Sequence, residues 1–228
     1  FLLFFFSFSG VSFAQINESF TTAVPLPSGW VTDNNSEPLG TVGHLQGNPA
    51  AFGENSGAPN AYIAVNFQST TGAGVISNWL ITPPVNMTNG DIFTFWTRTT
   101  DPGATVFPDR LQLRVSLNGT STNVGTTSTD VGDFTNLAVE INPTLTTTGY
   151  PSVWTQYSYT VTGLPAQTVG RFAFRYFVTD GGPTGANSDY IGIDDVVFNG
   201  QNPGCTATPA PGNTLSTGGA SSCAGVPF

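Results

Sequence analysis

The sequence has very little positive charge. It contains 14 acidic side chains but only five basic ones, all arginine, which gives the 228 residues a formal net charge of −9. Charged residues make up 8% of the chain, whereas soluble domains usually contain about 25%. Nucleic acids and anionic membranes are bound through Lys/Arg-rich surfaces, so we expect no nucleic-acid partner and no membrane insertion. Solubility must rest on Thr, Ser, Asn, Gln and Gly, a surface typical of an extracellular protein.

Residues for common hydrolytic chemistry are also scarce. His44 is the only histidine, so a zinc site would lack its second imidazole, and the Gly-x-Ser-x-Gly pattern of serine hydrolases is missing. A retaining glycosidase needs two carboxyl groups about 5 Å apart, yet the only carboxylate pair within a strand pattern occupies adjacent positions. We therefore predict a non-catalytic domain, with an accessory domain of a secreted hydrolase as a less favoured alternative.

The two ends differ from the body of the chain. Residues 1–15 are an apolar run ending in Ser12-Phe13-Ala14, the pattern of a partial secretory signal peptide; a buried N-terminal strand is the alternative. Residues 200–228 are rich in Pro, Gly, Ser and Thr, and we interpret them as a linker and the start of a truncated following module. Both cysteines, Cys205 and Cys223, lie there and could form a disulfide in an exported protein.

Residues 16–199 have the hydrophobic pattern of β-strands and no amphipathic helix. Strand-like segments bounded by Pro, Gly or Asn-Gly turns occur at 61–67, 75–81, 92–96, 111–117, 157–161, 171–178 and 190–198. Asn118-Gly119 predicts a hairpin. Short strands with long polar loops predict an all-β fold, a two-sheet antiparallel β-sandwich of the jelly-roll type. Arg114, Arg171 and Arg175 fall at outward positions, where we expect solvated charges.

The segment 190–198 carries two adjacent carboxylates within an apolar strand. Successive strand residues point to opposite faces, so we expect Asp194 and Asp195 on different sides of the sheet. An uncompensated buried carboxylate is costly, and a divalent cation would compensate it in a chain so poor in basic residues. We therefore predict bound Ca²⁺, with hydrogen bonds from backbone amides or pairing with an arginine as alternatives.

A series of short motifs extends over residues 16–199. They are, in order, Glu18-Ser-Phe20, Leu26-Pro-Ser-Gly-Trp30, Asn78-Trp-Leu-Ile-Thr-Pro83, Phe93-Thr-Phe-Trp96, Arg110-Leu-Gln-Leu-Arg-Val-Ser116, Arg171-Phe-Ala-Phe-Arg-Tyr176 and Ile193-Asp-Asp-Val196. This order resembles the cleaved-adhesin and choice-of-anchor J domains of secreted Bacteroidetes proteins, which are distantly similar to MAM-type jelly rolls. The resemblance implies a calcium-binding β-sandwich that serves as an adhesive or carbohydrate-binding module of a larger surface protein.

Two positions depart from that family pattern. The loop Thr32–Ser36 has a single aspartate, and Ser77 stands where the family commonly has an aspartate before Asn-Trp-Leu-Ile. Both changes remove a carboxylate and argue against a second cation site. For one Ca²⁺ where the first and last strands meet, the predicted ligands are Glu18 and Asp194, with Asp195 as an alternative and Asn78 completing the shell with backbone carbonyls.

Ligand contacts are harder to assign. Sugars stack on exposed aromatic rings, and Tyr62, Tyr150, Trp154 and Tyr190 are the candidates, although each could equally be a packing residue. The loop 180–189 is rich in oxygen ligands but lacks the spacing of a calcium loop, so we interpret it as a solvated Gly-rich loop. The predicted function is a secreted, calcium-stabilised module that binds surface glycans or proteins. The alternative is a structural subunit that self-assembles into an extracellular array or filament.

Overall fold

The computed structural model describes residues 15–103 and 105–200. The predicted signal peptide, the C-terminal linker and the Cys205–Cys223 pair lie outside these residues. The strands are β1 (Ile16–Glu18), β2 (Val31–Asn34), β3 (Glu37–Leu39), β4 (Leu45–Gln46), β5 (Ile63–Asn66), β6 (Thr70–Ile81), β7 (Val85–Met87), β8 (Ile92–Thr99), β9 (Leu111–Ser116), β10 (Asn136–Ile141), β11 (Thr155–Thr160), β12 (Thr168–Gly181) and β13 (Tyr190–Asn199), with one short 3-10 helix, η1 (Phe67–Ser69). In this part of the chain, no helix is long and apolar enough to cross a bilayer.

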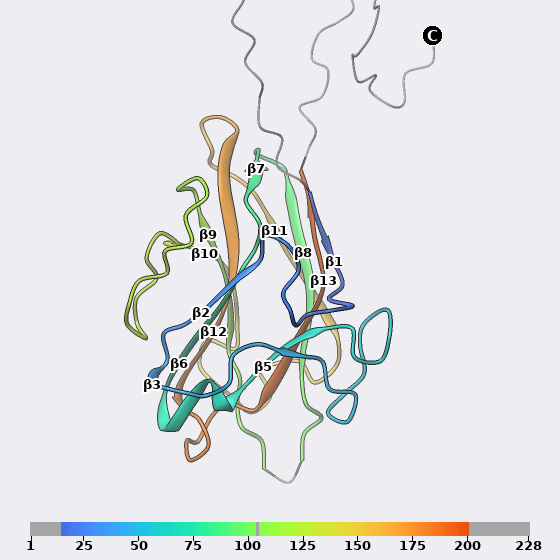
Figure 1. Ribbon diagram of the computed structural model, residues 1–228, viewed down its shortest axis with the longest axis vertical. Helices are drawn as coiled ribbons and strands as arrows, with labels where there is room; N and C mark the ends of the chain where they lie inside the picture. Colours follow the sequence, from blue (N-terminus) through green and yellow to red (C-terminus); the bar gives the residue numbers. More distant parts are fainter. Residues whose placement is uncertain (1–14, 104, 201–228) are drawn as a thin grey trace, which may run out of the picture.

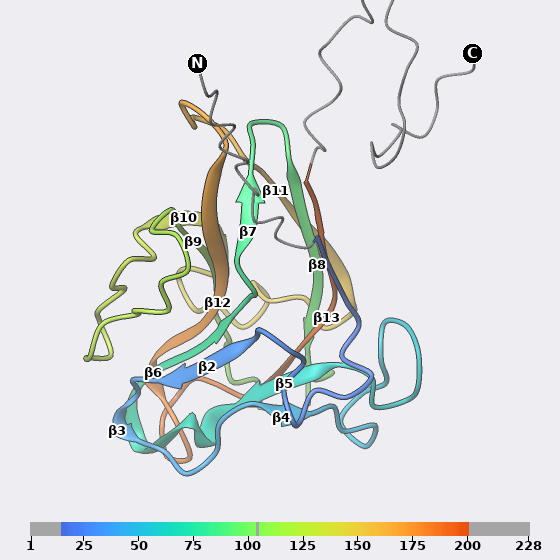
Figure 2. The same ribbon diagram turned by 45° about the horizontal axis from the view of Figure 1, so that its top comes forward.

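The strands form two antiparallel sheets packed face to face, as predicted (Figures 1 and 2). The six-stranded sheet has the order β11-β8-β13-β5-β4, and β1 pairs with β13. The seven-stranded sheet has the order β10-β9-β12-β6-β2, with β3 on β6 and β7 on β12. Strands that are neighbours in space are mostly distant in sequence, so the sheets are held by long-range pairing.

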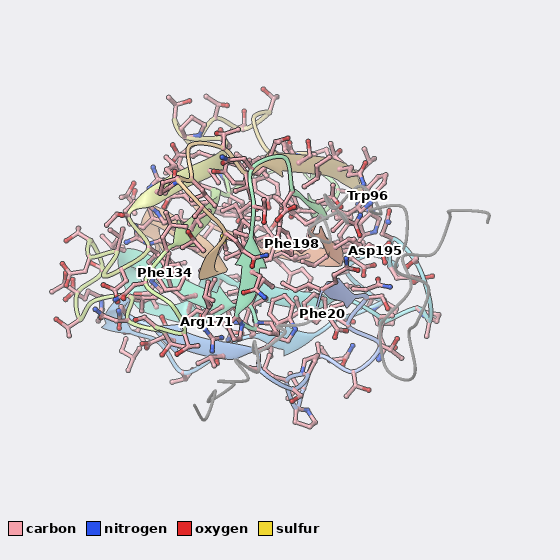
Figure 3. The ribbon with its side chains drawn as sticks, turned by 90° about the horizontal axis from the view of Figure 1, so that it is seen from above. Phe20, Trp96, Phe134, Arg171, Asp195 and Phe198 are labelled. Carbon is pink, nitrogen blue, oxygen red and sulfur yellow. The ribbon has the colours of Figure 1, made fainter. Side chains whose placement is uncertain are left out.

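Aromatic side chains fill the space between the sheets. Phe93 and Phe95 of β8 are fully buried and face β12, where the ring centroid of Phe172 lies 4.2 Å from that of Phe93. Phe174 lies 4.9 Å from Phe95, edge to face. Viewed from above, Phe198 and Phe20 lie within this interior (Figure 3). The alternation of apolar residues seen in the sequence thus selects the inward face of each central strand.

The expectation of solvated arginines on the outer face of the seven-stranded sheet is wrong for Arg171 and Arg175, and Arg114 is half-buried and donates to the Phe134 carbonyl. Arg175 is 1% exposed and Arg171 is 8% exposed, because the segment 117–135 folds back over this face and covers it. The guanidinium of Arg175 lies 3.8 Å from the ring centroid of Phe177. It donates to Ser77 Oγ and to the main-chain carbonyl of Ser128. Burial lowers the pKa of Arg175 to about 9.

The same segment replaces the hairpin predicted at Asn118-Gly119. Strands β9 and β10 do pair, but 19 residues, 117–135, connect them. They carry a small apolar core of their own, in which Phe134 and Val124 pack on Trp79 from outside the sheet. Figure 3 shows Phe134 at this far side, away from Phe20. A two-residue turn would have left Trp79 and Arg175 exposed.

We expect Arg175→Ala to loosen the segment 117–135. The substitution leaves the Ser128 carbonyl without this donor in a buried site, leaves Ser77 Oγ with the Trp79 indole N–H alone, and removes the packing on Phe177. The free energy of unfolding should fall by about 2–4 kcal/mol, and hydrogen exchange should accelerate first in residues 120–134. Leu117→Ala, an exposed position in the same segment, should change stability by less than about 0.5 kcal/mol. Equal effects of the two substitutions would contradict this assignment.

Candidate ligand-binding site

A cavity of about 430 Å³ opens among the loops at one end of the sandwich. This end lies at the bottom of Figure 1, where the connection that leaves β8 reaches furthest from the sheets. The cavity is lined by residues 99–103, 105–109, 146–148 and 150–152 and by Asp189. Its volume falls within the range of pockets that hold small ligands, roughly 300–1,000 Å³.

Asp109 forms the buried base of the cavity and joins the segments around it. Its side chain is 1% exposed. One carboxylate oxygen accepts hydrogen bonds from the Tyr176 hydroxyl and from the backbone N–H of Asp189, at 2.9 Å for the latter. The other accepts from Thr99 Oγ1 at 2.6 Å. The main-chain carbonyl of Asp109 accepts from Asn142 Nδ2. A single residue therefore links β8, β12 and two loops.

The environment of Asp109 favours its neutral form. Burial raises the pKa of the Asp109 carboxyl to about 6, and this effect outweighs the hydrogen bonds donated by Asp189, Thr99 and Tyr176, which lower it. The nearby charge of Asp189 raises the pKa further. Burial and the same carboxylate also raise the pKa of the Tyr176 hydroxyl well above its ordinary value, so Tyr176 remains a hydrogen-bond donor at neutral pH.

The cavity walls combine acceptors, hydroxyls and one exposed ring. Asp189 accepts a hydrogen bond from Thr100 Oγ1 at 2.7 Å, and a carboxylate has lone pairs left for further donors. Asp101 pairs with Arg98 at the rim, where its side chain is 79% exposed. The ring of Phe107 is 38% exposed. None of the lining residues is basic, so the site suits an uncharged ligand with hydroxyl donors and an apolar face, and it disfavours an anion.

One of the four predicted aromatic candidates lies at this cavity. Tyr150 lines it, but the side chain is 7% exposed and its hydroxyl is hydrogen-bonded to Thr97 Oγ1. The other three pack with Phe52 on the outer face of the six-stranded sheet, where Tyr62 is fully buried and Tyr190 is 9% exposed. Their contacts hold the segment 47–62: Trp154 donates to the Gly53 carbonyl, and both tyrosine hydroxyls accept from Asn48 N. A role for these three in ligand binding stays a prediction.

The carboxylates of Asp194 and Asp195 do not point to opposite faces as expected. The pairing of β13 with β8 shifts register between Asp194 and Val197, and Asp195 has a positive φ of 44°. This bulge lets both side chains reach one loop. Asp194 accepts from the backbone N–H groups of Asn55, Ser56 and Asp195, and Asp195 accepts from Asn55 Nδ2 and Ser56 Oγ. Burial raises the pKa of Asp194 to about 7.

The remaining predicted calcium ligands, Glu18 and Asn78, lie in different sheets. Glu18 lies on β1 opposite Val196 of β13, and its Oε1 accepts from Phe20 N at 2.7 Å. Asn78 lies on β6 in the other sheet, where its Nδ2 donates to Ser69 Oγ. Within residues 15–103 and 105–200, no three Asp, Glu, His or Cys side chains gather in a way that could hold a metal ion. The carboxylate pair would need carbonyl or amide oxygens to complete a calcium shell, and calcium binding stays a prediction.

The loop 180–189 is only partly the solvated loop that its composition suggests. Asp180 is exposed, and the backbone N–H of Asn187 donates to its carbonyl. Asp189, at the other end of the loop, turns into the cavity instead. Sequence reasoning missed Asp189, Asp109 and Phe107 as site residues. The signal for Asp109 was weak: it is an aspartate just before the apolar strand 111–117, within a loop of Pro, Gly and Thr.

The fold is similar to that of known adhesin structures. The K1 cleaved adhesin domain of Lys-gingipain from Porphyromonas gingivalis is 25% identical, with a TM-score of 0.55, over 82% of this chain and 99% of that one. The K2 domain of the same protein is 20% identical with a TM-score of 0.51, and the K3 domain is 19% identical with a TM-score of 0.50, each over 82% of this chain. These neighbours agree with the resemblance read from the motifs. No family model matches the chain, and no curated protein sequence does.

Asp109 should make the stability of the protein depend on pH. Its pKa is about 6 in the folded protein and about 4 in an unfolded chain, so between these values the folded state keeps a proton that the unfolded state has lost. The contribution of Asp109 to the free energy of unfolding should therefore decrease as pH rises through this window and stay constant above it. Asp109→Asn should make the decline shallower in urea denaturation, with the part due to Asp194 remaining.

The exposed carboxylate of Asp33 provides the control for this measurement. Asp33→Asn should leave the pH profile as in the unmodified protein. An Asp109→Asn profile that is as steep as the wild-type one would show that Asp109 titrates normally.

Proposed function

We propose that this domain is an extracellular, non-catalytic adhesion module that binds uncharged, hydroxyl-rich glycans in the cavity around Asp109. The observation that carries the proposal is the combination of Asp189, threonine hydroxyls and the exposed Phe107 ring in one cavity without basic residues. Sugar hydroxyls are recognised by carboxylate and hydroxyl partners, while the apolar face of a pyranose packs on an aromatic ring. The similarity to a cleaved adhesin domain supports an adhesive role.

The absence of a catalytic role is part of the proposal. Asp109 and Asp189 are the cavity's inner carboxylates, and both accept hydrogen bonds from fixed donors of the protein itself. His44 does not line the cavity, and burial lowers its pKa to about 3, so it stays neutral and unsuited to accept a proton near pH 7. The residues around the cavity thus provide binding groups that the fold already orients.

We also propose that Ca²⁺ binds at Asp194 and Asp195, in the middle of β13, and stabilises the domain there. The fit rests on two adjacent carboxylates that both contact the loop 55–56, one of them fully buried. In residues 15–103 and 105–200, the one ion pair is Arg98–Asp101, so neither carboxylate has a basic partner. Asp194 and Asp195 would hold the ion together with carbonyl or amide oxygens, and the ion would offset the repulsion between the two negative charges.

Glycan binding is tested on a glycan array and by calorimetry with the neutral oligosaccharides that it identifies. Phe107→Ala should weaken binding at least about tenfold, which corresponds to ~1.4 kcal/mol, because the ring loses its contact with the sugar face. Ile92→Ala is the matched control, since Ile92 is a similarly exposed apolar residue (43%) at the opposite end of β8. Unchanged affinity of Phe107→Ala, or an array signal confined to anionic glycans, would refute the assignment of the cavity.

Calcium binding is tested by thermal melting with excess EGTA or with millimolar CaCl₂. A bound ion should raise the melting temperature. At a free Ca²⁺ concentration a hundred times Kd, it should add about 2.7 kcal/mol to the free energy of unfolding. The gain should be large near pH 8 and small near pH 5, because Asp194, with a pKa of about 7, binds a proton at the lower pH.

Asp194→Asn should abolish the difference between EGTA and CaCl₂, whereas Asp33→Asn should preserve it. Identical melting curves in EGTA and CaCl₂ at the higher pH would rule out a structural calcium ion and would leave the backbone amides as the compensation for Asp194.

A further inference from the structure

A second hollow lies next to the cavity and shares two of its residues. It measures about 130 Å³ and is lined by Phe67, Phe107, Gly182, Pro183, Ser188 and Asp189. Phe107 and Asp189 line both spaces. The exposed ring of Phe107 therefore stands between them, with the carboxylate-bearing residue Asp189 common to both sides.

We propose that the two hollows are consecutive subsites of one groove, which binds an uncharged oligosaccharide longer than a single sugar. This inference rests on the proposed function and adds the length of the ligand to it. One sugar occupies the larger cavity and the next unit of the chain occupies the smaller hollow. Phe107 offers its ring at the junction, and Asp189 accepts hydrogen bonds from hydroxyls on either side.

Hydrogen bonds on the sides of both hollows hold the main chain at Asp189. Its N–H donates to the buried carboxylate of Asp109 at 2.9 Å, on the side of the large cavity. Its carbonyl accepts from the N–H of Phe67 at 2.9 Å, on the side of the small hollow. Ser188 N–H donates to the carbonyl of Pro108, next to Phe107 in the chain. Asp189 and the main chain next to Phe107 are thus held in place before a ligand arrives, which lowers the entropy lost on binding.

The wall of the small hollow is equally well defined. Gly182 N–H donates to Ser188 Oγ at 2.8 Å, and Gly182 has a φ of 105° that a residue with a side chain rarely adopts. A Cβ there would lie 2.2 Å from the Gly72 carbonyl oxygen. Glycine is therefore required for the loop to pack this closely, and the hollow is a built feature rather than a gap in a loose loop.

The chemistry of the small hollow matches that of the large one. Its lining contains no basic residue, and Asp189 is its one charged side chain. Phe67, Phe107 and Pro183 give it apolar surfaces against which a sugar ring can pack. Both subsites therefore favour neutral units, and a chain of uronic acids or sulfated sugars would meet Asp189 at the junction and be repelled.

The test measures affinity against ligand length. Calorimetric titrations use the neutral sugar that scores highest on the array, as monosaccharide, disaccharide and trisaccharide. We expect affinity to rise at least about tenfold from the monosaccharide to the longer chains. Pro183→Trp, which fills the small hollow, should remove that gain and leave the monosaccharide affinity within about threefold of wild type. Thr184→Trp places the same bulk at the adjacent exposed position, outside the lining, and should retain the gain.

The outcomes separate this inference from the function on which it rests. Equal affinity for the monosaccharide and the longer chains, with Phe107→Ala still weakening both, would keep the glycan site and overturn the second subsite. A Pro183→Trp variant that weakens the monosaccharide as strongly as the trisaccharide would also overturn it, because the hollow would then not be separate. Failure of every neutral sugar to bind would overturn both proposals.

Discussion

The packing of phenylalanines between the two sheets fixes the rest of the structure. Phe93 and Phe95 on β8 meet Phe172 and Phe174 on β12 across the interior. Each sheet contributes one of these central strands, so the contact sets the separation and angle of the sheets. The contact between β8 and β12 also positions the loops at the end of the sandwich. Thr99 ends β8, and Tyr176 lies two residues beyond Phe174, so the same packing brings both to the carboxylate of Asp109.

Neutral groups carry most of the charge compensation in this protein. Asp109 is surrounded by two hydroxyls and an amide, and Asp194 by three backbone amides. Arg175 donates to a hydroxyl and a carbonyl and lies against aromatic rings. Buried charges satisfied in this way remain costly to desolvate, which is why the pKa values of Asp109, Asp194 and Arg175 are shifted toward their neutral forms. Because the sequence has few basic residues, the buried carboxylates of Asp109 and Asp194 lack basic partners in the part of the chain that the structure describes, and their pKa values are raised.

Alternation of apolar residues predicted the central strands well, because alternate burial along one strand depends only on the residues of that strand. Strands β8, β9 and β12 bury every second side chain against the opposite sheet, so their pattern is visible in the sequence. The edge strands β2 and β3 are mostly exposed and carry no such signal. Periodicity also cannot reveal a shift of register. The bulge at Asp195 turned a pair expected on opposite faces toward a single loop.

The candidate site was largely invisible in the sequence, because its residues come together only in the folded chain. Asp109 and Asp189 are eighty positions apart and meet through one hydrogen bond. The burial of Arg175 likewise depends on the segment 117–135, whose path over the sheet no local pattern encodes. Alternation could not separate Tyr150, which lines the cavity, from Tyr62, which packs beneath a loop.

The course of β13 has a mechanical consequence. The strand begins one residue after Asp189, at the binding end, and finishes beside Gly200, whose carbonyl accepts a hydrogen bond from Gln15 at the opposite end (Figure 1). A pull between a captured ligand and Gly200 would run along the axis of this strand. Its ladders with β5 and β8 are antiparallel, and their hydrogen bonds lie across that axis. Such tension would shear the bonds together instead of opening them one by one, so the domain should resist a load along β13 better than a load across it.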